Sequence, residues 1–185
     1  MDLQLKGRRA LVTGSSSGIG EAIVRMLTDE GAHVCVHGRN RERAEAVAKD
    51  IGAAGIAIGE LAEPGMAATV HAEAVAALGG NIEILINNAG GNARGNTSKK
   101  PHEIDAEDFV ANYRANTLGA VQLCQLSVPD MVANTFGRIV NVSSAVAMQP
   151  NFMGTDYSAA KAALLNFTVS LAGSLRGVNV TANVL

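Results

Sequence analysis

The stretch Arg8-Arg-Ala-Leu-Val-Thr-Gly-Ser-Ser-Ser-Gly-Ile-Gly20 decides the fold, because it joins a short apolar run directly to a glycine-rich turn. The pattern predicts a buried strand over Arg8–Thr13, followed by a helix over residues 18–30 with Ile23 and Leu27 on one face. At such a turn the free N–H groups and the positive end of the helix dipole face outward. The turn therefore predicts a phosphate-binding site. The alternative is a turn that serves only tight packing.

Apolar runs typical of buried strands alternate along the chain with stretches of helical periodicity. The expected strands are Arg8–Thr13, His33–His37, Gly55–Gly59, Ile82–Ile86, Arg138–Ser143 and Asn179–Leu185, and the expected helices cover residues 18–30, 40–52, 64–79, 105–134 and 157–176. Strict alternation predicts an α/β fold, a doubly wound parallel sheet of six strands that helices cover on both faces. Such sheets bind ligands at the carboxyl ends of their strands.

The composition is that of one globular domain over residues 1–185, with 48% hydrophobic residues and a formal net charge of −2. This charge argues against a nucleic-acid partner or an anionic membrane surface. No apolar run reaches the roughly 18 residues of a membrane span, and the polar start is not a signal peptide, so we expect a cytoplasmic protein. Cys35 and Cys124 are expected to be buried reduced thiols, and no metal-ligand spacing is present.

A second informative stretch is Tyr157-Ser-Ala-Ala-Lys161, which places a phenol and an ammonium one helical turn apart. Alone, both groups transfer protons poorly at neutral pH, but a close ammonium favours phenolate over phenol. Ser144, thirteen positions before the tyrosine, adds a hydroxyl that can face the same reacting atom. These residues predict a general acid/base unit. The alternative is an exposed pair on a helix surface.

Together these motifs resemble those of the short-chain dehydrogenase/reductase family, and the resemblance covers essentially the whole chain. Thr13–Gly20 is similar to that family's cofactor turn, and Asn87-Asn-Ala-Gly90 follows the fourth expected strand, as it does in the family. The family's catalytic tetrad falls, in order, on Asn116, Ser144, Tyr157 and Lys161. In general character the chain is most similar to the 3-oxoacyl-carrier-protein reductase branch, and the fold that this implies is Rossmann-type.

The resemblance implies an oxidoreductase that transfers a hydride between a nicotinamide and the carbon of a ketone or secondary alcohol. Tyr157 would act as general acid/base, Lys161 would favour its phenolate form and hold the nicotinamide ribose, and Ser144 would hydrogen-bond the carbonyl oxygen. Asn116 would position a water that relays protons to Lys161. Ser143 competes with Ser144, but the spacing favours the latter. The alternative is a catalytically silent member that binds cofactor in a regulatory or structural role.

The end of the second expected strand bears on the choice of cofactor. Family members that bind NAD carry an acidic residue there for the ribose hydroxyls, whereas this chain has Gly38 followed by Arg39. A guanidinium binds a phosphate bidentately, so Arg39, assisted by Asn40 and Arg41, favours NADP(H) over NAD(H). The alternative is that Arg39 is a solvated residue before a helix. Glu60 stands where many relatives contact the adenine.

The expected cofactor site comprises Gly14, Ser16, Ser17, Gly18, Ile19, Gly20, Arg39, Asn40, Glu60, Leu61, Asn88, Ala89, Gly90, Tyr157 and Lys161. The expected substrate-binding residues are Ser144, Asn92, Met148 and Phe152, with mostly apolar neighbours, as small-molecule sites usually have. The charges of Arg94, Lys99 and Lys100 either attract a phosphorylated carrier or are simply solvated. The expected partner is a small-molecule carbonyl or alcohol.

The resemblance also implies a homo-oligomer, a dimer or tetramer that pairs the helices near 105–134 and 157–176. The alternative is that the chain's own sheet covers the apolar residues of these helices. Members of the family are usually longer than this chain, which stops at Leu185, where the sixth strand is expected to end. We therefore expect a C-terminally incomplete domain without the lid and the last strand. A naturally short protein is the alternative.

Overall fold

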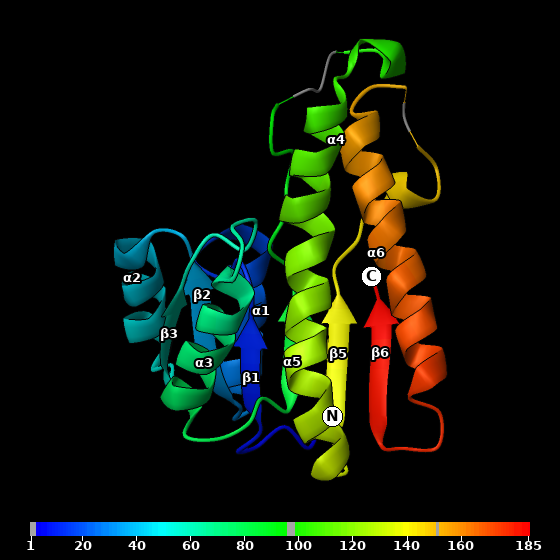
Figure 1. Cartoon of the computed structure of the whole chain (residues 1–185). Coiled ribbons are helices and arrows are strands. Elements are labelled where there is room, and N and C mark those ends of the chain that lie inside the picture. Colours follow the sequence, from blue (N-terminus) through cyan, green and yellow to red (C-terminus); the bar gives the residue numbers. More distant parts are fainter. Residues whose placement is uncertain (1–2, 96–98, 151) are drawn as a thin grey trace.

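Six parallel strands form one sheet in the order β3-β2-β1-β4-β5-β6 in the computed structural model of the protein, which describes residues 3–95, 99–150 and 152–185 (Figure 1). The strands are β1 Arg9–Val12, β2 His33–Gly38, β3 Gly55–Ile58, β4 Ile84–Asn87, β5 Gly137–Asn141 and β6 Val180–Val184. This order confirms the doubly wound α/β fold. From β1 the chain adds strands first on one side, β2 and β3, and then on the other side, from β4 onward. Open α/β sheets bind ligands in the crevice at the point where this order reverses.

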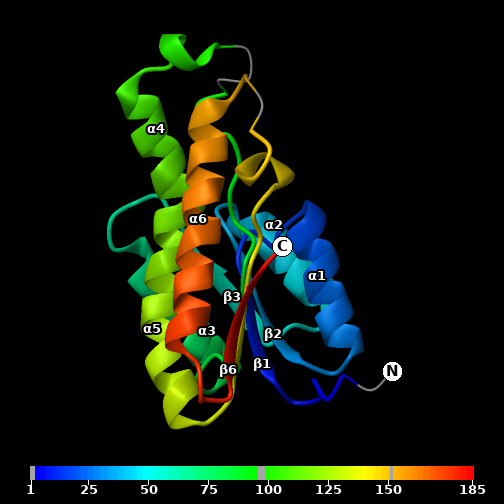
Figure 2. The same ribbon diagram turned by 90° about the vertical axis from the view of Figure 1, so that its right-hand side faces the viewer.

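Helices cover both faces of the sheet, with α1 and α2 on one face and α3, α5 and α6 on the other (Figure 2). The helical elements are α1 Gly18–Asp29, α2 Arg41–Ile51, α3 Met66–Leu78, η1 Pro101–Glu103, α4 Ala106–Tyr113, η2 Arg114–Leu118, α5 Gly119–Ala133, η3 Ala145–Ala147 and α6 Thr155–Ser174. None of the described helices is long and apolar enough to cross a lipid bilayer.

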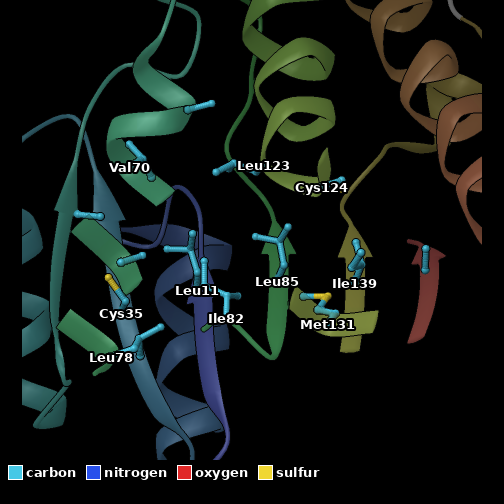
Figure 3. Packing of buried hydrophobic residues seen from close by; sticks show 14 of the residues in the cluster. Leu11, Cys35, Val70, Leu78, Ile82, Leu85, Leu123, Cys124, Met131 and Ile139 are labelled. Atoms are coloured by element: carbon cyan, nitrogen blue, oxygen red, sulfur yellow. The ribbon is translucent and has the colours of Figure 1, made fainter. Parts of the chain in front are cut away.

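Alternate residues of each strand enter opposite cores, because successive side chains of a strand point to opposite faces. Leu11, Leu85 and Ile139 project from neighbouring strands toward α3 and α5 (Figure 3). Val12 and Val36 enter the second core, against α1 and α2. Since both faces are covered, residues 10–12 of β1 and 84–86 of β4 are all apolar, which is why these strands appear in the sequence as short continuous apolar runs.

Both cysteines lie in the first core and are free thiols. Burial raises the pKa of Cys35 and that of Cys124 to about 12. The thiolate is the reactive form of cysteine, so both side chains act here as small apolar groups.

We expected one helix over residues 105–134, and this prediction is wrong in one respect. A π-helical turn, η2, separates α4 from α5. In a regular α-helix two consecutive side chains point about 100° apart, so they rarely share one buried face. Asn116 and Thr117 are nevertheless both buried, and the Thr117 hydroxyl donates to the carbonyl oxygen of Ala160 on α6 at 2.7 Å. The wider turn lets both polar side chains enter the site region. The other element bounds agree with expectation within two residues.

Candidate active site

A cleft of about 960 Å³ opens at the carboxyl ends of β1 to β4. Most residues that the sequence assigns to the cofactor lie in its wall: Gly14, Ser16, Ser17, Arg39, Asn40, Glu60, Leu61, Asn88, Ala89 and Gly90. The remaining three glycine-turn positions, Gly18, Ile19 and Gly20, begin α1 next to this wall. The turn and the strand ends that the sequence predicted to meet are therefore brought together.

Two turns form the floor of the cleft and are bonded to each other. The Thr13 hydroxyl oxygen accepts hydrogen bonds from the backbone N–H groups of Asn88 at 3.0 Å and Ala89 at 2.9 Å. The Asn88 side-chain amide donates to the carbonyl oxygens of Thr13 at 3.0 Å and Gly14 at 3.2 Å. These bonds join segments about 75 residues apart in the sequence into one unit.

Close packing of this unit explains two of its glycines. A Cβ on Gly14 would lie 2.9 Å from the Cα of Ala89, and a Cβ on Gly20 would overlap the carbonyl oxygen of Gly14. Gly18 has open space around it but adopts a φ of +59°, which side chains rarely tolerate. The turn thus serves tight packing, and the same packing leaves the N-terminus of α1 open toward the cleft.

The two adjacent asparagines at the end of β4, Asn87 and Asn88, bond to opposite sides. Asn88 bonds the glycine turn, whereas Asn87 is buried and donates to the side-chain oxygen of Asn141 on β5 at 2.8 Å. Asn141 in turn donates to the hydroxyl of Thr168 on α6 at 2.8 Å. This buried chain ties β4, β5 and α6 together behind the cleft. It is a structural role that the motif alone did not reveal.

One side of the cleft carries an ion pair between Arg39 and Glu60, whose Nη1 and Oε2 atoms are 2.8 Å apart. The Arg39 side chain is 77% exposed, so this pair contributes little to stability. Arg41, which the sequence offered as an assistant, pairs instead with Glu45 at 3.5 Å and does not line the cleft. Arg43 does line it, and Asn40 accepts a hydrogen bond from its backbone N–H at 2.9 Å. Asn40 is the N-cap of α2, and an N-cap side chain bonds the backbone N–H three positions later. This spacing could have indicated Arg43 from the sequence.

On the other side of the cleft Gly90 belongs to the wall, and the Lys161 ammonium lies directly behind it. A Cβ on Gly90 would be 3.1 Å from the Lys161 Nζ. Lys161 is 3% exposed, donates to the carbonyl oxygen of Val142 at 2.9 Å, and has its Nζ 5.9 Å from the centre of the Tyr157 ring. Burial lowers the pKa of Lys161 to about 8. Tyr157 and Lys161, which the sequence also assigns to the cofactor site, are therefore close to each other but are not among the residues that line the cleft; Lys161 lies next to the cleft, behind Gly90.

The two competing serines are used differently. The Ser143 hydroxyl donates to the backbone carbonyl of Lys161 at 3.1 Å, which commits its proton to α6. The Ser144 oxygen accepts a hydrogen bond from the Val146 N–H at 3.4 Å, at the start of η3, and this bond does not use its proton. The arrangement favours Ser144 as the serine that offers a hydrogen-bond donor, in agreement with the spacing argument.

Asn116 holds the segment after Gly90 instead of facing the open cleft. Its Oδ1 accepts from the Gly91 N–H and its Nδ2 donates to the Gly91 carbonyl, both at 2.8 Å. One turn earlier, Asn112 accepts from the Ala93 N–H at 3.1 Å and donates to Asp156 at 2.8 Å, next to the tyrosine. Sequence reasoning missed Asn112 and Asp156. The available signal was two asparagines four positions apart on one helix face.

The expected substrate residues are not brought together. Asn92 lines the cleft, but Met148 and Phe152 are 75% and 70% exposed and lie outside its wall. Arg94 and Lys99 lie 3.8 Å and 3.3 Å from the carboxylate of Asp108, which fastens their loop to α4. Across the described ranges, no three His, Cys, Asp or Glu side chains gather as a metal site would require.

A doubly wound sheet, a glycine-turn cleft at its switch point and a tyrosine–lysine pair on the neighbouring helix α6 are the features of an oxidoreductase. The chain belongs to the short-chain dehydrogenase/reductase family, since the sequence profile of short chain dehydrogenases matches residues 8–185.

Three relatives show how far the similarity extends. The 3-oxoacyl-acyl-carrier-protein reductase of Aquifex aeolicus is 36% identical over 191 residues, which cover 100% of this chain and 75% of that protein. The L-sorbose reductase of Gluconobacter frateurii, solved with NADPH and L-sorbose, has a TM-score of 0.89 and 31% identity over 100% of this chain and 70% of its own. A 3-oxoacyl-acyl-carrier-protein reductase of Agrobacterium tumefaciens C58, solved with NADP, has a TM-score of 0.89 and 34% identity, with coverages of 97% and 69%.

Proposed function

We propose that this protein reduces a ketone, or oxidises the matching secondary alcohol, with NADP(H), and that Tyr157 is the general acid/base. The observation that carries the proposal is the position of the Lys161 ammonium, buried behind Gly90 and 5.9 Å from the centre of the Tyr157 ring. In the proposed role, the ammonium stabilises the negative charge that develops on the tyrosine oxygen as its proton leaves. The wall of the cleft fits a dinucleotide, because its glycine turn leaves room for backbone to approach a pyrophosphate.

The bound nicotinamide would supply or accept the hydride. In reduction, the Tyr157 phenol donates its proton to the substrate oxygen, and in oxidation the phenolate takes it back. The Ser144 hydroxyl donates a hydrogen bond to the same oxygen as negative charge develops there. Asn116 acts at a distance by fixing Gly91, and so keeps the segment in front of Lys161 in place.

Preference for NADP(H) over NAD(H) rests on Arg39 and Arg43, which both line one side of the cleft. The 2′-phosphate is the group that distinguishes the two cofactors, and a guanidinium binds it through charge-assisted hydrogen bonds. Relatives solved with NADPH or NADP support the same choice.

Replacing Arg39 with alanine is expected to weaken NADPH binding roughly tenfold to a hundredfold and to leave NADH binding within about twofold, since a charge-assisted hydrogen bond contributes about 1.5–3 kcal/mol. Fluorescence titration of the purified protein with each cofactor measures both dissociation constants. Arg41→Ala is the matched control, because Arg41 lies two positions after Arg39 at the start of α2, pairs with Glu45 and lies outside the wall. Equal binding of both cofactors by the wild type would rule out the assignment.

The reaction itself is tested by following NADPH oxidation at 340 nm with a panel of simple ketones and β-ketoesters. Turnover of any member of the panel supports the proposal. Tight NADPH binding without turnover of any of them would favour the silent, cofactor-binding alternative.

We also propose that the protein forms a dimer or tetramer through an apolar groove between α4, η2 and α6. The groove has a volume of about 320 Å³ and is lined by Phe109, Val110, Tyr113, Arg114, Leu118, Asp156, Ala159 and Ala160. Light scattering is expected to show an oligomer for the wild type and a monomer for Val110→Glu, because a charge would be buried at the interface. Val178→Glu is the control, since Val178 is similarly exposed, 43% against 41%, and lies outside the groove. A monomeric wild type contradicts this proposal.

A further inference from the structure

His37 is a buried histidine that lies directly beneath the cleft, where β2 ends. Its side chain is 2% exposed, and both of its ring nitrogens have backbone partners. The N–H of Gly14 points at Nδ1 over 3.0 Å, and Nε2 lies 3.2 Å from the carbonyl oxygen of Gly59. One ring therefore connects the first residue of the glycine turn with the residue before Glu60.

These two partners settle the form of the imidazole. A backbone N–H can only donate, so Nδ1 must accept, and a carbonyl can only accept, so Nε2 must carry the proton. The ring is thus neutral, with its proton on Nε2. A second proton on Nδ1 would face the N–H of Gly14 and break that contact.

The backbone of His37 reinforces the link to the turn. Its carbonyl accepts from the Ser15 N–H at 2.8 Å, and its own N–H donates to the Ser15 hydroxyl at 2.9 Å. Gly14 and Ser15 are therefore held by three hydrogen bonds from a single residue. The imidazole adds the contact with Gly59. The next two residues, Glu60 and Leu61, form the wall of the cleft opposite the glycine turn.

We propose that His37 is a positioning residue for the cofactor, whose Nδ1 acceptor holds Gly14 and with it the phosphate-binding turn in place, while the contact of Nε2 with Gly59 orients the ring. The inference rests on the proposed dinucleotide function of this cleft. His37 itself lines the cleft, but the proposed role is exerted through Gly14 and Gly59 and does not depend on contact with the cofactor. Cofactor affinity should therefore depend on which of the two ring contacts a substitution keeps.

The electrostatic setting supports a neutral ring. Burial lowers the pKa of His37 to about 4, against the weaker opposing influence of its bond to Gly59 and of two carboxylates, Glu60 and Glu73. Glu73 reaches over from α3 and accepts the Ile58 N–H at 2.8 Å, while Glu60 is paired with Arg39. The unfolded chain binds this proton near pH 6.5, so the contribution of His37 to stability is present above that pH and is lost as pH falls toward about 4.

Two isosteric substitutions separate the two contacts. His37→Asn keeps an acceptor near the Nδ1 position, and we expect it to bind NADPH within about threefold of the wild type. His37→Gln keeps a donor near the Nε2 position and leaves the N–H of Gly14 without its acceptor. We expect about tenfold weaker binding for this variant, the size of one lost buried hydrogen bond. His33→Asn, at the exposed start of the same strand, is the control.

Titration with NADPH decides between the outcomes. Unequal loss, larger for His37→Gln, supports the inference, and equal affinity of His37→Gln and the wild type overturns it. Equal weakening by both variants also overturns it, since this is what a merely space-filling residue would give. If the wild type binds neither NADPH nor NADH, the proposed function is refuted as well. Failure of the His37 inference and failure of the proposed function can therefore be told apart.

A second measurement needs no variant. Nitrogen-15 NMR of the wild-type protein is expected to show the His37 ring as the neutral form with its proton on Nε2 at about pH 5.5. A ring that becomes protonated near pH 6.5 would overturn the inference even if His37→Gln does not fold. In folded His37→Asn, the decline in unfolding free energy between about pH 6.5 and pH 4 should be smaller than in the wild type.

Discussion

Replacing Tyr157 with phenylalanine is expected to reduce ketone reduction by about 10²–10⁴-fold, the range that general acid catalysis contributes. Phenylalanine keeps the ring but removes the hydroxyl that acts as proton donor in the proposed mechanism. NADPH binding should change by less than about twofold, because the phenol contributes to the proton transfer and not to the phosphate end of the cleft. Steady-state rates with the best substrate of the panel, together with a cofactor titration, measure both effects.

Tyr113→Phe is the matched control for this variant, as Tyr113 is the only other tyrosine and is 44% exposed on α4, away from the cleft wall. It should retain wild-type turnover. Substantial residual turnover of Tyr157→Phe would remove Tyr157 from the role of acid and leave the Ser144 hydroxyl as the next candidate.

Replacing Lys161 with methionine is expected to reduce turnover by at least about 10²-fold, because the neutral side chain no longer favours phenolate over phenol. The substitution removes a buried charge at nearly constant shape but also leaves the Val142 carbonyl without its donor, so the two effects oppose each other and the unfolding temperature should change little. A loss of activity without a loss of stability is the result that separates this role from a structural one.

The same lysine sets an expected pH limit. Burial lowers the pKa of Lys161 to about 8, so the ammonium loses its proton above that pH and the rate of ketone reduction should fall there. Lys100→Met is the control, since Lys100 is exposed. A reduction rate that stays level to about pH 10 would contradict a role for the cation.

The fold could be predicted because apolar runs and helical periodicity reflect which residues are buried. Their order along the chain gives the order of strands and helices. Strands covered on both faces must be apolar throughout, as Leu11 and Val12 are, and strict alternation leaves few topologies for a parallel sheet. The meeting of Tyr157 and Lys161 was also predictable, because one helical turn joins them. Local spacing was sufficient for these features.

Contacts between distant segments were not predictable in the same way. The partner of Arg39 is Glu60, twenty-one positions away, and nothing in either neighbourhood specifies the pair. The π-turn at Asn116 depends on bonds to Gly91 and Ala160 that only the folded chain brings near. Met148 and Phe152 were expected near substrate because they are apolar, but apolar character alone does not say which way a loop residue points.

The bonds between Thr13 and Asn88 have a consequence for the order of folding. They close a loop of about 75 residues, and the entropy of that closure must be offset before the contacts form. Pairing of β1 with β4 closes a loop of the same length, so we expect the floor of the cleft to assemble together with these two strands. In native-state hydrogen exchange, the amides of Asn88 and Ala89 should report this event, and any ligand that rests on both turns should slow their exchange.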